Sequence, residues 1–82
     1  MKLGIYSLKN VLFNGEVVSI NCDTESGEIT ILDHHSPLIS ILKKGVIKIT
    51  DKQKQVHYIP AISGFLEISS SNETKLLIEE GV

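Results

Sequence analysis

The residue types best suited to metal binding or catalysis lie together in Asp33-His34-His35, directly before Ser36-Pro37. Aspartate and histidine are good ligands for zinc and manganese. Adjacent side chains on an extended backbone point to opposite faces, so His34 and His35 are badly placed to chelate one ion. We therefore interpret this segment as a turn held by hydrogen bonds from the Asp33 and Ser36 side chains to the backbone. We expect no metal and no cofactor there.

The other candidate residues do not form a catalytic arrangement. His57 has no Ser, Cys or carboxylate at a motif spacing, so we expect a half-exposed strand residue. Cys22 shares an apolar face with Val18 and Ile20, which predicts a buried small hydrophobic residue. Asp33-His34-His35 resembles the signature of the DHH phosphoesterases, but those enzymes need a much larger α/β domain and further acidic motifs. A metal-dependent hydrolase is thus the least favoured hypothesis, and we predict a binding or structural protein rather than an enzyme.

Composition narrows the choice of partner. The 82 residues suffice for one domain, and the net charge of −2 and the four aromatic residues argue against binding to nucleic acid. A single cysteine excludes an internal disulfide and suits a reducing compartment. No targeting peptide and no membrane-spanning apolar run is expected. Asp23, Glu25 and Glu28 form an acidic turn around Gly27, which is either a solvated loop or a charged contact surface.

Short stretches of alternating apolar residues recur between turn signals along the whole chain. Asn14-Gly15 predicts a tight turn, Pro60 an edge, bulge or bend, and Gly64 a kink or bulge. Expected strands cover residues 2–8, 11–13, 16–22, 28–32, 46–50, 55–59, 62–69 and 74–79. This spacing of turn signals predicts an all-β sandwich or barrel of short antiparallel strands.

Residues 36–45 carry conflicting local signals. Ser36-Pro37 is typical of a helix start and Lys43-Lys44-Gly45 of a helix end. The β-branched residues between them are poor helix formers, and the segment spans barely two helical turns. Periodicity alone leaves a helix and a strand equally open.

The order of features along the whole chain resembles the N-terminal domain of the epsilon subunit of F-type ATP synthases. The features are the start Leu3-Gly4-Ile5-Tyr6-Ser7, the turn Gly27-Glu28, the bend His35-Ser36-Pro37-Leu38, the run Lys43-Lys44-Gly45-Val46-Ile47 and the segment Gly64-Phe65-Leu66-Glu67-Ile68. The resemblance implies a flattened antiparallel β-sandwich of about ten short strands over residues 1–82, with a strand at 38–42. It also implies a non-catalytic rotor subunit that helps fasten the gamma subunit to the ring of c subunits, coupling proton or sodium translocation to ATP synthesis.

The resemblance also implies roles for individual residues. Glu28 would face the c-ring, with Gly27 keeping the turn tight and Asp23 and Glu25 beside it. A second set, His35, Pro37 and Leu38, would lie toward gamma. The apolar residues on both faces of 38–42 would then fill the core on one side and pack on a partner on the other. The subunit would sit peripherally at the cytoplasmic side of a bacterial inner membrane, or at the matrix or stroma side in an organelle.

This sequence departs from the family pattern at several positions. Ser36 replaces a usual Ala, Asp33 a common Pro, Thr30 a common Gly and Ser63 the first residue of a usual Gly-Gly pair. The helical hairpin that follows this domain in typical members has no counterpart in the 82 residues. The alternative hypothesis is a free-standing β-sandwich that binds an unrelated partner and shares only the architecture.

Overall fold

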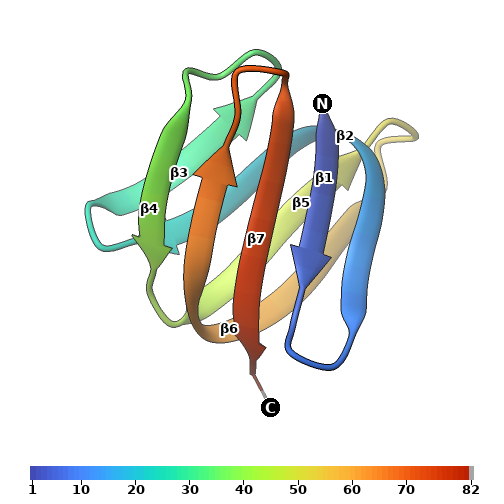
Figure 1. Cartoon of the computed structure of the whole chain (residues 1–82). Helices are drawn as coiled ribbons and strands as arrows, with labels where there is room; N and C mark the ends of the chain where they lie inside the picture. The colour runs from blue at the N-terminus through green and yellow to red at the C-terminus, as the bar shows by residue number, and fades with distance from the viewer. Residues whose placement is uncertain (82) are drawn as a thin grey trace.

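The computed structural model describes residues 1–81, and these form strands and turns only (Figure 1). The strands are β1 (Lys2–Tyr6), β2 (Val11–Thr24), β3 (Gly27–Leu32), β4 (Leu38–Leu42), β5 (Gly45–Asp51), β6 (Val56–Ile68) and β7 (Glu73–Glu80). The all-β class is confirmed, and the open choice at residues 38–42 is decided in favour of a strand. The described residues contain no helix that could cross a membrane.

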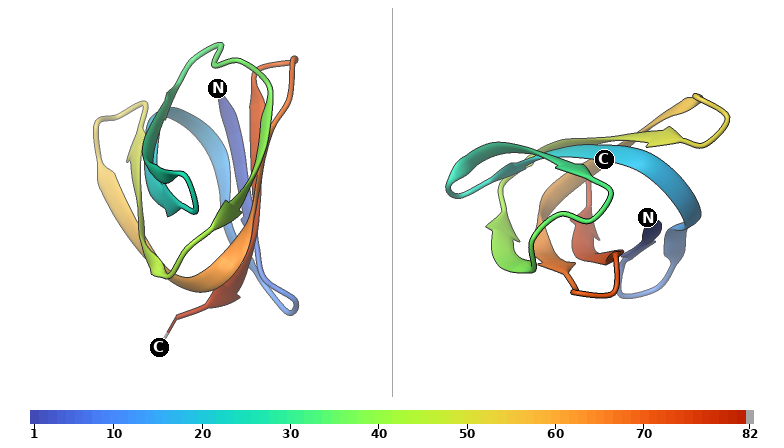
Figure 2. Two further views of the ribbon diagram at one scale, coloured as in Figure 1. Left: turned by 90° about the vertical axis from the view of Figure 1, so that its left-hand side faces the viewer. Right: turned by 90° about the horizontal axis from the view of Figure 1, so that it is seen from above.

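The strands form two layers that share their longest members. Strands β4, β7 and β1 lie in the near layer of Figure 1, and β2, β3 and β5 cross behind them. β2 pairs with β1 through its first half and with β3 and β5 through its second half. β6 likewise pairs first with β5 and then with β4 and β7. Because β1 pairs with both β2 and β7, it joins the two layers along one side, as Figure 2 shows.

The count of seven strands corrects the expectation of about ten. Residues 11–13 and 16–22 belong to one strand, because Asn14 and Gly15 pair with β1 instead of making the predicted tight turn. Residues 55–59 and 62–69 are joined in β6 in the same way. Both strands bend from one layer into the other without losing their ladders. One pair, β1 with β7, is parallel and departs from the expected antiparallel pattern.

An irregularity between Val17 and Ser19 explains one wrong assignment of faces. The register of β2 against β5 shifts there, as in a β-bulge. The shift turns Val17 into the core and leaves Val18 40% exposed, although the alternation predicted that Val18 would share the face of Ile20 and Cys22. Ile20 and Cys22 are buried as expected.

β6 changes layer where the sequence placed its breakers. Pro60 pairs opposite Val46 at the end of the β5 ladder, and its carbonyl accepts a hydrogen bond from the Gly81 N–H at 3.0 Å. A register shift follows between Ala61 and Ser63. Gly64 sits under β7 so tightly that a Cβ there would lie 2.5 Å from the Leu77 carbonyl oxygen. Of the edge, bulge or bend predicted at Pro60, the structure shows a bulge-like register shift just after it, and Gly64 is required by close strand packing rather than by a kink or bulge.

The core lies between the two layers and takes alternate residues from every strand. Its fully buried aliphatic side chains are Leu3, Ile5, Val17, Ile20, Ile31, Ile49, Leu66 and Leu76. Ile47 and Ile78 are also buried, so the expected inward faces of β5 and β7 are confirmed. The core fixes the relative positions of the turns at both ends, where the candidate site residues lie.

Candidate functional site

The acidic turn is the tip of the hairpin that joins β2 and β3. The Thr24 hydroxyl donates to the Gly27 carbonyl at 2.8 Å and accepts from the Ser26 N–H at 3.2 Å. Gly27 has a φ of 116°, which only glycine adopts without strain. Asp23 pairs directly opposite Glu28 across the ladder, so two carboxylates face the same side at close range. Like charges in that position repel each other.

The tip is fastened to the end of β4 by backbone hydrogen bonds. The Glu25 N–H donates to the Ile41 carbonyl at 3.0 Å, and the Lys43 N–H donates to the Asp23 carbonyl at 2.9 Å. A Cβ at Gly45 would lie 2.6 Å from Asp23 Oδ2, so the chain passes close behind this carboxylate. The fold therefore brings the whole predicted c-ring set onto one braced, exposed tip: Asp23, Glu25, Gly27 and Glu28.

The bend that carries the predicted gamma set lies at the other end of β3 and β4. Pro37 is exposed, whereas His35 and Leu38 are half-buried. Leu38 begins β4 opposite Ile68, and the His35 ring donates from Nδ1 to the Ser36 carbonyl at 2.8 Å. These residues lie together, but they are separated from the acidic tip by the full length of both strands. No residue of the two sets touches the other set, so two distinct contact regions are available.

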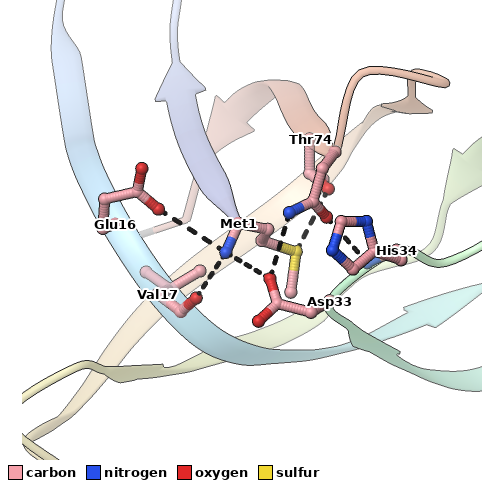
Figure 3. A network of polar contacts seen from close by, with 7 residues as sticks. Met1, Glu16, Val17, Asp33, His34 and Thr74 are labelled. Carbon is pink, nitrogen blue, oxygen red and sulfur yellow. Dashed lines mark hydrogen bonds and ion pairs between the residues drawn. The ribbon is translucent and has the colours of Figure 1, made fainter.

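The bend is not held as predicted. Asp33 Oδ1 accepts hydrogen bonds from the Met1 amino group and from Asn72 Nδ2, and the His34 N–H donates to Asn72 Oδ1 at 2.7 Å. Figure 3 shows the Met1 amino nitrogen between Glu16, Val17 and Asp33. The expected local bonds from the Asp33 and Ser36 side chains are thus replaced by contacts with the chain start and the β6–β7 turn. The bond from the Met1 amino group, followed by that from Asn72, lowers the pKa of Asp33 below its ordinary value.

His57 has a partner that its sequence neighbours did not indicate. It is half-exposed in β6, as predicted, and its Nε2 lies 2.9 Å from Asp51 Oδ2. Asp51 Oδ1 also accepts from the N–H groups of Gln53 and Gln55, and the Phe13 ring stands edge-on to the imidazole. The hydrogen bond with His57 is the main reason that the pKa of Asp51 is lowered. The sequence did contain a signal for this pair, because Asp51 and His57 stand on either side of the turn between two expected strands.

The remaining candidates are the possible metal ligands and the thiol of Cys22. In residues 1–81, no three His, Cys, Asp and Glu side chains are arranged to hold a metal ion. Cys22 is buried, as predicted, and burial raises the pKa of its thiol to about 11. A thiol with so high a pKa is a poor nucleophile.

The outer face of the near layer carries an apolar row that the sequence analysis recognised only in β4. Ile41 pairs with Phe65, Phe65 with Leu77, and Leu77 with Tyr6, so one side chain from each of four neighbouring strands lies in a line. Phe65 is 59% exposed and Leu77 56%. With Ile39 they border a hollow of about 500 Å³. Contiguous exposed apolar side chains of this kind are typical of protein contact surfaces.

Comparison with known proteins identifies the family. Residues 1–82 match the family described as "ATP synthase, Delta/Epsilon chain, beta-sandwich domain". The chain belongs to this family. It is similar to the ATP synthase epsilon chain of Dichelobacter nodosus, with 41% identity over 78 residues that cover 93% of this chain and 52% of that protein. For the epsilon chain of Sulfurimonas denitrificans, the identity is 35% over 78 residues, which cover 95% of this chain and 58% of that protein.

Solved structures show the same fold at lower sequence identity. The epsilon-type chain superposes on a chain in the Euglena gracilis mitochondrial ATP synthase, OSCP/F1/c-ring, with a TM-score of 0.90 and 18% identity. The superposition covers 98% of this chain and 51% of the other. For a chain of the Tetrahymena thermophila mitochondrial ATP synthase central stalk and c-ring, the TM-score is 0.83 and the sequence identity 13%. That superposition covers 98% of this chain and 63% of the other. At these identities the likeness concerns the fold alone.

Two facts follow from the family match. The resemblance of the sequence to the epsilon family is confirmed. The alternative, a β-sandwich that shares the architecture without being related, is therefore not supported. The chain spans about half the length of the epsilon chains that it matches. The family match therefore concerns the β-sandwich domain. The function of the longer relatives can only be proposed for this chain.

Proposed function

We propose that this chain serves as the β-sandwich domain of a rotor subunit in an F-type ATP synthase, where it fastens the gamma subunit to the c-ring. The observation that carries the proposal is the match of all 82 residues to the delta/epsilon family, with relatives that are ATP synthase epsilon chains. The two structural neighbours, which share the fold, come from mitochondrial ATP synthase structures that contain the c-ring. In this role the domain is non-catalytic and transmits torque, and it reaches the membrane surface only through the complex.

The two contact regions suit a bridging role because they lie apart on a stiff body. We assign the acidic tip, with Asp23, Glu25, Gly27 and Glu28, to the c-ring. His35, Pro37 and Leu38 at the opposite bend are assigned to gamma. The hollow beside the apolar row extends toward this second set, since Ile39, which borders the hollow, follows Leu38 directly in β4. The exposed side chains of the apolar row would give the gamma contact an apolar centre, which is the usual composition of a stable interface.

Co-purification tests this proposal with the complete chain. A tagged chain should retain both gamma and the c-ring from detergent-solubilised membranes that contain the same ATP synthase. Charge reversal by Glu28→Lys should reduce the retained c-ring and leave gamma in place, because the two regions do not touch. Lys52→Glu, a charge reversal on the exposed β5–β6 turn outside both regions, is the control. Failure of the unaltered chain to retain either partner would contradict the proposal.

A further inference from the structure

The β3–β4 bend and the β6–β7 turn lie at the same end of the molecule (Figure 1). The bend, residues 33–37, leads from β3 in the far layer to β4 in the near layer, and the turn covers residues 69–72. Within the described chain, β3 pairs with β2 alone, and the residues of the bend belong to no strand. Contacts from outside the bend must therefore fix its shape.

The side chain of Asn72 reaches from the turn to the bend at two points. Its Oδ1 accepts from the His34 N–H at 2.7 Å, and its Nδ2 donates to Asp33 Oδ1 at 3.2 Å. The Met1 amino group also donates to Asp33 Oδ1 (Figure 3). Among the described residues, these are the hydrogen bonds that reach the bend from beyond the strand ends that flank it. Asn72 thus supplies the one that holds the backbone of the bend.

The backbone is left-handed at both ends of the 2.7 Å bond. The φ angle is 61° at His34 and 60° at Asn72, a conformation that costs free energy in residues other than glycine. At His34 the bond from its own N–H offsets this cost. Without the bond, φ would relax to negative values and the chain would leave the residue in another direction. His35 and Pro37 follow directly and would move, whereas Leu38 is held in the β4 ladder.

The turn that carries Asn72 is itself anchored to the core. The Lys2 N–H in β1 donates to the Asn72 carbonyl at 3.2 Å. Two residues further on, Thr74 is fully buried, and its hydroxyl donates to Met1 Sδ at 3.5 Å. A side chain whose own position is fixed by packing and hydrogen bonds can impose a shape on a bend that lacks a ladder.

We propose that Asn72 is a positioning residue for the gamma contact, and that its side chain holds His35 and Pro37 in the orientation that gamma binds. The inference rests on the proposed function and adds to it a residue from outside the bend. A bend that is ordered before binding avoids the loss of conformational freedom that a loose bend suffers on its partner. Removal of the Asn72 side chain should therefore weaken binding to gamma about five- to tenfold.

Asn72→Gly tests the proposal directly, because glycine keeps the left-handed backbone of the turn and removes only the bonds to the bend. Ser70→Gly places a glycine in the same turn without touching those bonds, and it is the matched control. Both changes are made in the complete chain, and each chain is titrated against immobilised gamma at a temperature where its melting curve shows it folded. Asn72→Gly should bind gamma about five- to tenfold more weakly than Ser70→Gly.

Asn72→Asp separates positioning from a general loss of stability. The new carboxylate still accepts from the His34 N–H, but it repels the Asp33 carboxylate, so gamma should bind weakly at neutral pH. At about pH 5 the two carboxyl groups share a proton, which restores a donor. The Met1 amino group, Glu16 and His34 also face this site, so each affinity is divided by that of the unaltered chain at the same pH. The ratio for Asn72→Asp should rise about threefold as the pH falls, and that for Asn72→Gly should stay constant.

The outcomes separate the two proposals. Equal binding of gamma by Asn72→Gly and Ser70→Gly would overturn the inference, and so would a ratio for Asn72→Asp that does not change with pH. Either result would leave the proposed function intact as long as the unaltered chain binds gamma. Failure of the unaltered chain to bind gamma would instead contradict the proposed function itself.

Discussion

Phe65 and Leu66 are neighbours in β6 whose side chains should separate stability from partner binding. Leu66 is fully buried in the core, whereas Phe65 is 59% exposed in the apolar row of the near layer. A chain of 82 residues has a total stability of about 4–12 kcal/mol. Leu66→Ala removes a fully packed side chain and should cost about 3 kcal/mol, a large part of that total. The melting temperature should fall by roughly 10–25 °C.

Phe65→Ala should behave differently because its ring loses little contact with the core. We expect a change within about 1 kcal/mol in the free energy of unfolding. Binding to gamma should weaken by about 1–2 kcal/mol, or roughly five- to thirtyfold, as for an aromatic residue at an interface centre. Urea unfolding measures the first quantity, and titration of immobilised gamma measures the second. Equal destabilisation by the two variants, or unchanged gamma binding by Phe65→Ala, would refute this division of roles.

Three further predictions concern the fold. Gly64→Ala should cost about 1–3 kcal/mol in urea unfolding, because its Cβ would meet the Leu77 carbonyl oxygen; unchanged stability would mean that β6 and β7 lie further apart. The lowered pKa of Asp51 stabilises the fold above the ordinary aspartate value of about 3.9, and this contribution disappears as the pH falls through the lower folded value. Asp51→Asn should therefore lower the urea midpoint at pH 7 and have a smaller effect once the pH falls below the lowered pKa of Asp51 in the folded chain. A difference that does not depend on pH would contradict the pairing with His57. Cys22 should resist alkylation by iodoacetamide at pH 8 until urea unfolds the chain, because its thiol is buried and its pKa is raised to about 11; rapid labelling of the folded chain would place it at the surface.

Sequence patterns predicted the strand faces and turns that depend only on residues close together in the chain. The alternation in residues 46–50 and 74–79 is sufficient to orient Ile47, Ile49, Leu76 and Ile78 into the core. The turn at the acidic tip could also be predicted from the sequence, because the residues that form it, Thr24–Gly27, are neighbours in the chain. The local pattern of residues 38–42 was not sufficient, since their composition is compatible with two periods, and the strand was expected there only from the family resemblance. Pairing with β6 and burial of Leu42 confirm that strand.

Features that depend on distant contacts escaped prediction. The register shift after Val17 reverses the pattern of faces in β2, and it arises where this strand changes partners. Asp33 bonds with Met1, 32 positions away in the chain, so its turn could not be understood from its neighbours. The apolar row has the same character. Ile41, Phe65 and Leu77 alone are ordinary exposed residues and Tyr6 is half-buried, and only the registers of four strands bring them into a line.

The bridging role is tested most directly by the composition of a reassembled complex. Purified gamma, c-ring and this chain are mixed in detergent, and the mass of the product is measured by native mass spectrometry. We predict one complex with one copy each of this chain, gamma and the ring, and loss of this chain from it when the apolar row and the acidic tip are both altered. A complex of gamma and ring that forms to completion and excludes this chain would contradict the account.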